Sequence, residues 1–138
     1  PVSGDRPSRY ATFERIERPK SMSDDAIDLP EALERVQDDK GFLVELLDVF
    51  QEDFLKKRAV LAGALTAKDI TKVKEVAHSM KGSSGNISAK GIYATCLELE
   101  KLSKTNSTDG MQDLARNIDV QFAGVQAFAV QLKKELGG

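Results

Sequence analysis

Residues 42–66, FLVELLDVFQEDFLKKRAVLAGALT, decide the fold class of this chain. Apolar side chains recur along this stretch in steps of three, four or seven residues. They are Leu43, Leu47, Phe50, Phe54, Leu61 and Leu65, and the stripe is widened by Phe42 and Leu46. This spacing places one apolar face on an α-helix. At about 1.5 Å per residue the helix is about 37 Å long, which is typical of a helix in a bundle.

The segment 111–136 repeats this pattern without interruption. Its apolar positions are Met111, Leu114, Ile118, Phe122, Val125, Ala129, Leu132 and Leu136. We therefore predict another long amphipathic helix, which follows the polar turn 103–110 and ends at Gly137.

Two shorter helices are predicted between the long ones. The segment 69–85 has Asp69 as its N-cap, and Gly85 with Asn86 as a left-handed stop. Its inward positions are Ile70, Val73, Ala77, Met80 and Ser84. The inward positions of the segment 88–104 are Ile92, Cys96, Leu99 and Leu102. We expect Cys96 to be a small core residue.

A short helix is predicted before the long ones. Asp28 is suited to be its N-cap, and Pro30 is tolerated in its first turn. We expect this helix to run to about Asp38, with Gly41 separating it from the next. No segment shows the alternation of a strand. The sequence predicts an all-α fold, an antiparallel up-down-up-down four-helix bundle with a short extra N-terminal helix, in a domain of residues 26–138.

Composition narrows the class of protein. Residues 1–25 lack apolar periodicity and hold three of the four prolines, so we expect a polar linker or tail that is mostly disordered. A formal charge of −2 argues against a nucleic-acid binder. No apolar stretch approaches the roughly 20 residues that span a bilayer, so no membrane contact is expected. A single cysteine fits the reducing cytoplasm, where we expect a monomer.

His78 is the residue that can carry chemistry. It is the only histidine, and it lies in the middle of the predicted helix 69–85. On a helical wheel it lies roughly 140° from the direction of the core, so its ring should face solvent. A neutral imidazole nitrogen is a good nucleophile near neutral pH. One histidine and one cysteine on different helices make no metal site, and no cofactor is expected.

The helical neighbours of His78 suggest a protein partner. They are Lys74, Glu75, Lys81, Gly82 and Gly85. A glycine inside a helix costs about 1 kcal/mol relative to alanine, so Gly82 needs a reason. Its missing side chain would let another protein's backbone approach the ring closely. The transfer of a phosphoryl group between two proteins requires such an approach. Lys81 can neutralise the charge of an arriving phosphoryl group, and it disfavours the imidazolium form of the ring.

The stretch 77–87, AHSMKGSSGNI, resembles the signature of histidine phosphotransfer domains. In that signature a histidine is followed by any residue, an apolar residue, lysine and glycine. Residues 27–33, IDLPEAL, together with 42–54, are also similar to the opening of these domains, and the likeness covers residues 26–136. It implies that His78 is phosphorylated and that Lys81 and Gly82 serve it. It also implies receiver domains as partners, which bring their own aspartate and magnesium site.

The resemblance thus implies a phosphorelay intermediate, which takes a phosphoryl group on His78 from a receiver aspartate and passes it to another receiver. We expect the receiver to dock around Gly82, Gly85, Lys74 and Glu75. The chain is either a module of a hybrid sensor histidine kinase or a free shuttle. No kinase activity of its own is expected, because no nucleotide-binding glycine loop is present. The alternative is a helical docking module that binds receivers or other signalling partners without phosphorylation.

Overall fold

The computed structural model describes residues 26–137. Within them the chain forms five helices and no strand: α2 (Leu29–Arg35), α3 (Lys40–Ala67), α4 (Ile70–Asn86), α5 (Lys90–Ser103) and α6 (Met111–Gly137). The predicted tail, residues 1–25, lies outside the described residues. Among the helices described, none is both long and apolar enough to cross a membrane.

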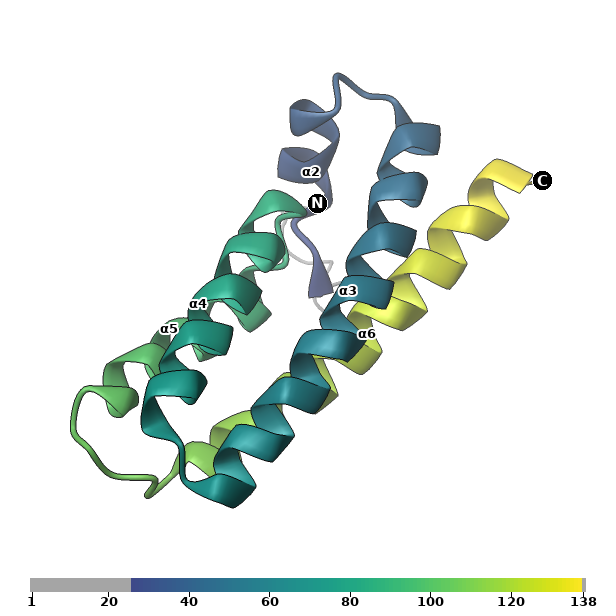
Figure 1. Ribbon diagram of the computed structural model, residues 1–138. Coiled ribbons are helices and arrows are strands. Elements are labelled where there is room, and N and C mark those ends of the chain that lie inside the picture. The colour runs from purple at the N-terminus through teal and green to yellow at the C-terminus, as the bar shows by residue number, and fades with distance from the viewer. Residues whose placement is uncertain (1–25, 138) are drawn as a thin grey trace, which may run out of the picture.

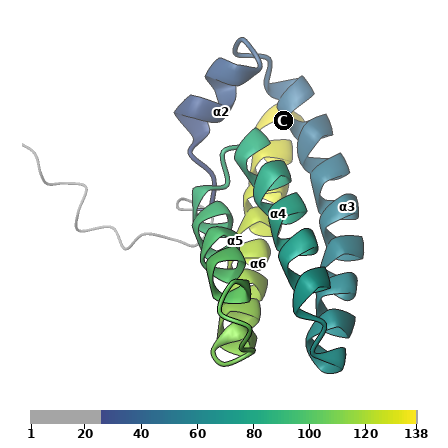
Figure 2. The same cartoon turned by 60° about the vertical axis from the view of Figure 1, so that its left-hand side comes forward.

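The four long helices form a bundle, and α2 lies at one end of it (Figures 1 and 2). Each long helix contacts two others: α3 and α5 both lie against α4 and α6. The chain reverses direction at each short connection, so neighbouring helices are antiparallel. The predicted all-α up-down-up-down bundle with an extra N-terminal helix is confirmed.

Aspartate residues are the N-caps of three of the helices. The side chains of Asp28, Asp39 and Asp69 each accept a hydrogen bond from the backbone N–H three residues further on, at 3.2, 3.0 and 3.1 Å. Each bond satisfies one of the N–H groups that a helix leaves unpaired at its start. The predicted caps Asp28 and Asp69 are confirmed, and the structure adds Asp39 before α3.

The break between α2 and α3 differs from the prediction. The first helix ends at Arg35 rather than near Asp38, because Gln37 and Asp38 take left-handed backbone angles, with φ of 54° and 64°. Gly41 does not separate the helices, since it lies in the first turn of α3. The capping side chain of Asp39 sets this boundary instead.

The end of α4 also differs from the prediction. Gly85 and Asn86 are helical rather than a left-handed stop, and the left-handed residue is Ser88, with φ of 61°. The Ser88 hydroxyl donates to Glu31 Oε1 at 2.7 Å, and the Ser88 carbonyl accepts a hydrogen bond from the Asp28 N–H at 2.9 Å. These tertiary contacts with the α2 region hold the turn after α4, so Gly85 is not needed to end the helix.

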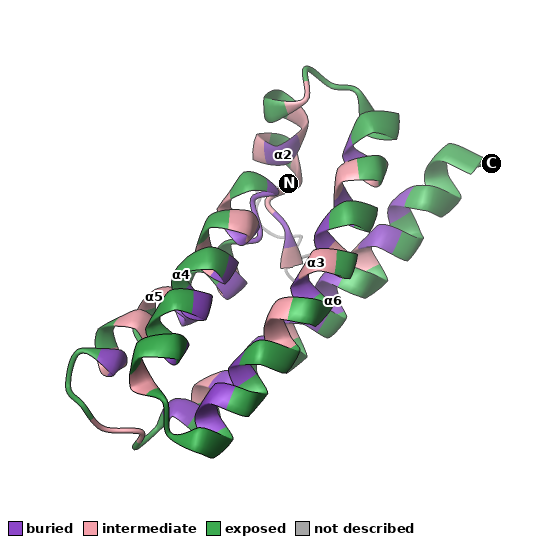
Figure 3. Cartoon of the chain, viewed as in Figure 1, coloured by how far each residue is buried: buried purple, intermediate pink, exposed green. Residues whose placement is uncertain are grey.

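The core is one apolar cluster enclosed by the four long helices, and its residues are purple in Figure 3. The rings of Phe54 and Phe122 stack with their centroids 4.7 Å apart and join α3 to α6. Cys96 is fully buried, as predicted. Burial raises the pKa of its thiol to about 12, so Cys96 remains an unreactive thiol at neutral pH.

Some apolar positions are less buried than their spacing predicts. Phe42 is 47% exposed and Leu136 is 46% exposed. They lie in the first turn of α3 and the last turn of α6, where neighbouring helices no longer cover the side chains. Ile70, Leu46 and Leu102 are only half-buried. Periodicity therefore gave the correct face but not the ends of the buried stripe.

Candidate functional site

His78 lies in the middle of α4, on its outer face. Ala77 and Met80 of the same helix are fully buried in the core, whereas the His78 side chain is 69% exposed. The prediction that this ring faces solvent is confirmed. The helix that carries the ring is fixed by its buried face, so the imidazole stands at a defined position on the surface.

A carboxylate from α5 joins His78 to Lys81. Glu100 Oε2 lies 3.0 Å from His78 Nδ1, and Glu100 Oε1 lies 2.7 Å from Lys81 Nζ. The side chains of Glu100 and Lys81 are only 13% and 19% exposed. We call these three residues the histidine bridge. It brings together His78 and Lys81, the two residues that were predicted to carry the chemistry, and a third that the sequence did not reveal.

Glu100 was missed because its role depends on the packing of two helices. It follows the buried residue Leu99 and lies one turn after Cys96, at the edge of the apolar stripe of α5. A glutamate in that place is commonly a solvated residue at the border of the core. Only the antiparallel contact of α4 with α5 sets Glu100 beside His78. The one feature of the sequence that could have pointed to Glu100 is a charged residue next to the apolar stripe of α5.

The histidine bridge fixes the ionisation of its carboxyl and ammonium groups. Burial raises the pKa of Glu100, but contacts with Lys81 and His78 outweigh burial and bring that pKa below its usual value. The contact with Glu100 raises the pKa of Lys81. Glu100 is therefore a carboxylate and Lys81 an ammonium near neutral pH.

The ionised carboxylate also selects the tautomer of the ring. A carboxylate can only accept hydrogen bonds, so Nδ1 must carry the proton in its contact with Glu100. In a neutral imidazole the lone pair is then on Nε2. The geometry leaves that nitrogen free to act as a nucleophile, on a side chain that is largely exposed.

The two glycines near His78 have different surroundings. A Cβ at Gly82 would meet no other atom within 4 Å, so packing within the described chain does not require a glycine there. A Cβ at Gly85 would lie 3.3 Å from the Tyr93 ring of α5. The close approach of α4 to α5 therefore explains Gly85, whereas Gly82 has no such explanation.

Lys74 and Glu75 lie about one turn before His78, and both are exposed. They help to line an open hollow of about 540 Å³ beside the imidazole, together with Thr71, His78 and Glu100. The structure thus places Lys74, Glu75 and His78 around one open space, with Glu100 as its wall on the α5 side.

Comparison with known proteins assigns the chain to a family. The profile of the Hpt domain family matches residues 45–136. The chain belongs to the Hpt domain family. The matched range begins within α3, contains α4 and α5, and ends one residue before the end of α6, so it includes the whole histidine bridge. The α2 helix of this Hpt domain lies outside the matched range.

Two similar proteins are named as histidine-containing phosphotransfer proteins. Histidine-containing phosphotransfer protein 2 of Arabidopsis thaliana is 26% identical over 99 residues, which are 68% of this chain and 64% of that protein. The chain thus spans less than two thirds of this relative's length. The crystal structure of histidine-containing phosphotransfer protein B (HptB) from Pseudomonas aeruginosa PAO1 is similar with a TM-score of 0.70 and 26% identity. That similarity covers 80% of this Hpt domain and 93% of the other chain.

Proposed function

We propose that this Hpt domain is a phosphorelay intermediate, in which His78 accepts a phosphoryl group from a receiver-domain aspartate and passes it to another receiver. The histidine bridge is the observation that carries this proposal. It presents an exposed imidazole, holds its Nδ1 with a carboxylate, and keeps an ammonium on the same carboxylate. Family membership and the two phosphotransfer relatives support it.

The transfer step follows from the tautomer of the ring. The lone pair of His78 Nε2 attacks phosphorus, and the Nε2–P bond forms as the bond from phosphorus to the aspartate oxygen breaks. The aspartate leaves as a carboxylate. The proton stays on Nδ1, where Glu100 balances the positive charge that develops on the ring. Transfer to the next receiver is the same step in reverse.

We further propose that the domain is a carrier without kinase activity. It would work as a monomer in the cytoplasm, with receiver domains as its partners.

Mixing the domain with a panel of aspartate-phosphorylated receivers tests the transfer of the phosphoryl group to His78. We expect label on this domain that acid removes and base does not, in contrast to the base-labile aspartyl phosphate. Absence of label from every receiver and from phosphoramidate would leave the docking module as the function.

Replacing Lys81→Ala should slow phosphoryl acceptance several-fold and shorten the lifetime of the phosphorylated state. The ammonium lies beside the site that receives the phosphoryl charge, and it reaches the same carboxylate as the ring. We also expect the free energy of unfolding to fall, because a largely covered carboxylate loses its partner. Label decay and denaturant unfolding measure the two effects. An unchanged rate and lifetime would show that Lys81 serves stability alone.

Replacing Glu100→Gln should slow acceptance by about tenfold from a receiver and from phosphoramidate alike. The amide keeps the size of the side chain but no longer fixes the proton on Nδ1 or balances the charge on the ring. Ring ¹⁵N chemical shifts should show a mixed tautomer in the variant. The matched control is Glu98→Gln, an exposed glutamate of the same helix, which should change neither rate nor shifts. A rate that falls with one donor only would contradict this role.

A further inference from the structure

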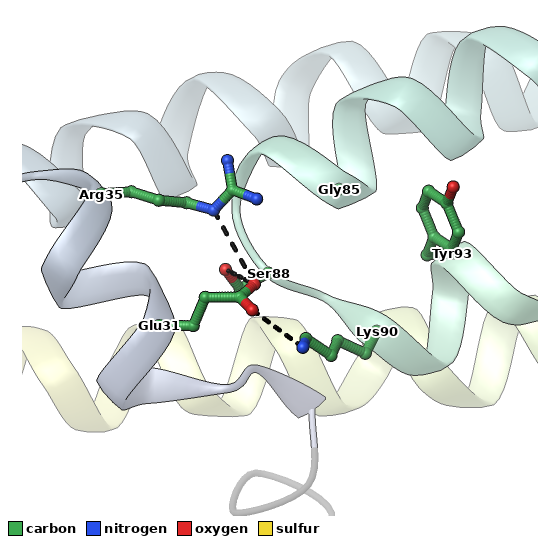
Figure 4. A pocket seen from close by; sticks show the side chains of 6 residues that line it. All are labelled: Glu31, Arg35, Gly85, Ser88, Lys90 and Tyr93. Carbon is green, nitrogen blue, oxygen red and sulfur yellow. Dashed lines mark hydrogen bonds and ion pairs between the residues drawn. The ribbon is translucent and has the colours of Figure 1, made fainter.

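We propose that a pocket over Gly85 receives an acidic side chain of the receiver domain that docks on His78; this inference rests on the proposed phosphorelay function. The pocket has a volume of about 380 Å³ and lies between α2, the end of α4 and the start of α5 (Figure 4). Its lining residues are Glu31, Arg35, Gly85, Ser88, Lys90 and Tyr93. We call it the Gly85 pocket.

The Gly85 pocket lies within reach of a partner centred on His78. Gly85 follows His78 by two helical turns on the same face of α4, which is about 10 Å along the helix axis. A standard protein interface covers about 800 Å² on each partner, a patch about 30 Å across. A receiver placed over the imidazole therefore covers the pocket as well.

The acceptor groups of the Gly85 pocket are already occupied. Glu31 Oε2 lies 2.8 Å from Lys90 Nζ, and Glu31 Oε1 accepts the Ser88 hydroxyl at 2.7 Å and lies 3.8 Å from Arg35 Nε. Hydrogen bonds from Lys90 and Ser88 lower the pKa of Glu31, so it stays ionised. Glu31 thus holds two cations in place, with both of its oxygens already in contact with donors.

Within residues 26–137, which the structure describes, the donor groups of the pocket retain free capacity. Arg35 contacts Glu31 through Nε, its side chain is 50% exposed, and its terminal nitrogens point away from Glu31 in Figure 4. Tyr93 is 41% exposed and lines the pocket together with Gly85. A carboxylate accepts hydrogen bonds only, and its two oxygens match the guanidinium fork. The pocket therefore suits an acidic side chain better than a basic or apolar one.

Two residues of the Gly85 pocket come from α2, and this makes the pocket a determinant of which receiver domain binds. Glu31 and Arg35 belong to α2, which lies outside the range that matches the Hpt family profile. Gly85 leaves this part of the pocket free of a side chain, and a Cβ there would lie 3.3 Å from the Tyr93 ring. Any receiver can present its aspartate to His78, but only one with an acidic side chain at the right distance gains the contact with Arg35.

The test is Arg35→Gln in the full chain, with the phosphorylated receiver that transfers fastest among a panel. We expect the KM for that receiver to rise about tenfold while kcat stays within about twofold, and the salt dependence of KM to flatten. Labelling by phosphoramidate should be unchanged, because that donor needs no docking surface. Arg35→Lys should restore part of the affinity, since it keeps the charge but not the fork. The matched control is Arg116→Gln, an exposed arginine of α6, which should leave KM unchanged.

Three results would overturn the Gly85 pocket as a docking site. The first is an unchanged KM in a variant whose melting temperature equals that of the parent chain. The second is a loss of kcat with both donors, which would mean that Arg35 acts on His78 itself. The third is tight binding of inorganic phosphate at the Gly85 and Tyr93 amides, seen by NMR titration without a receiver, because that defines a free-anion site. Failure of the phosphorelay proposal is distinct, since His78 would then take no label from any donor.

A variant that loses stability would leave the Arg35 result open, so Gly85→Ala provides a second measurement. The added methyl group enters the floor of the pocket at 3.3 Å from the Tyr93 ring and keeps every charge. We expect it to raise the KM for the receiver at least threefold, with phosphoramidate labelling again unchanged. An unchanged KM in both variants would exclude the pocket from docking.

Discussion

Replacing His78→Gln should abolish the uptake of phosphoryl label from receivers and from phosphoramidate, because His78 is the only histidine of the chain. The free energy of unfolding should change by less than about 0.5 kcal/mol. The side chain is 69% exposed, and the amide of glutamine can still donate a hydrogen bond to Glu100. Acid-labile label on gels and thermal unfolding followed by circular dichroism measure the two quantities.

The unfolding measurement is the control for this variant, since an unfolded chain would also fail to take label. Label that persists at the parent level in folded His78→Gln would place the acceptor elsewhere. A loss of several kcal/mol would instead give the imidazole a structural role that its exposure does not suggest.

Replacing Gly82→Gln should lower the rate of transfer from a receiver by a factor of about 100, while labelling by phosphoramidate falls less than about threefold. A Cβ at Gly82 meets open space, so the new side chain fits the Hpt domain itself. It would stand about one helical turn from His78, on the path that we expect a receiver backbone to take. A misplacement of about 1 Å between reacting groups can reduce a rate 100-fold. Stability should rise by up to about 1 kcal/mol, since glycine is a poor helix former.

The matched control for Gly82 is Gly63→Gln. Gly63 is also helical, exposed and free of neighbours within 4 Å, but it lies near the end of α3. We expect Gly63→Gln to gain similar stability without loss of transfer from either donor. Equal losses with receiver and phosphoramidate in Gly82→Gln would mean that the side chain disturbs the imidazole. No loss with either donor would remove steric access as the reason for this glycine.

Sequence patterns predicted the helices correctly wherever the burial of one helix face determines that a helix forms. Leu43, Leu47 and Phe50 repeat at helical spacing, and burial of that face dominates the energetics of a helix in a bundle. The same wheel predicted that His78 faces solvent, because the direction of a side chain on a helix follows from its number alone. The boundary near Gly41 was wrong because the Asp39 cap and the left-handed Gln37 outweighed the presence of a glycine.

The sequence by itself determined the all-α class, the buried faces and the exposed His78 with Lys81 and Gly82 beside it, since these depend on contacts a few residues apart. Tertiary structure alone decided the partner of the imidazole. Glu100 is 22 residues from His78 in the chain, and their contact depends on the rotation and register of α5 against α4. Tertiary structure also formed the Gly85 pocket, which is lined by Arg35 of α2 and Tyr93 of α5. Helical periodicity fixes which way each side chain points, but the side chains that meet across helices depend on how the helices pack.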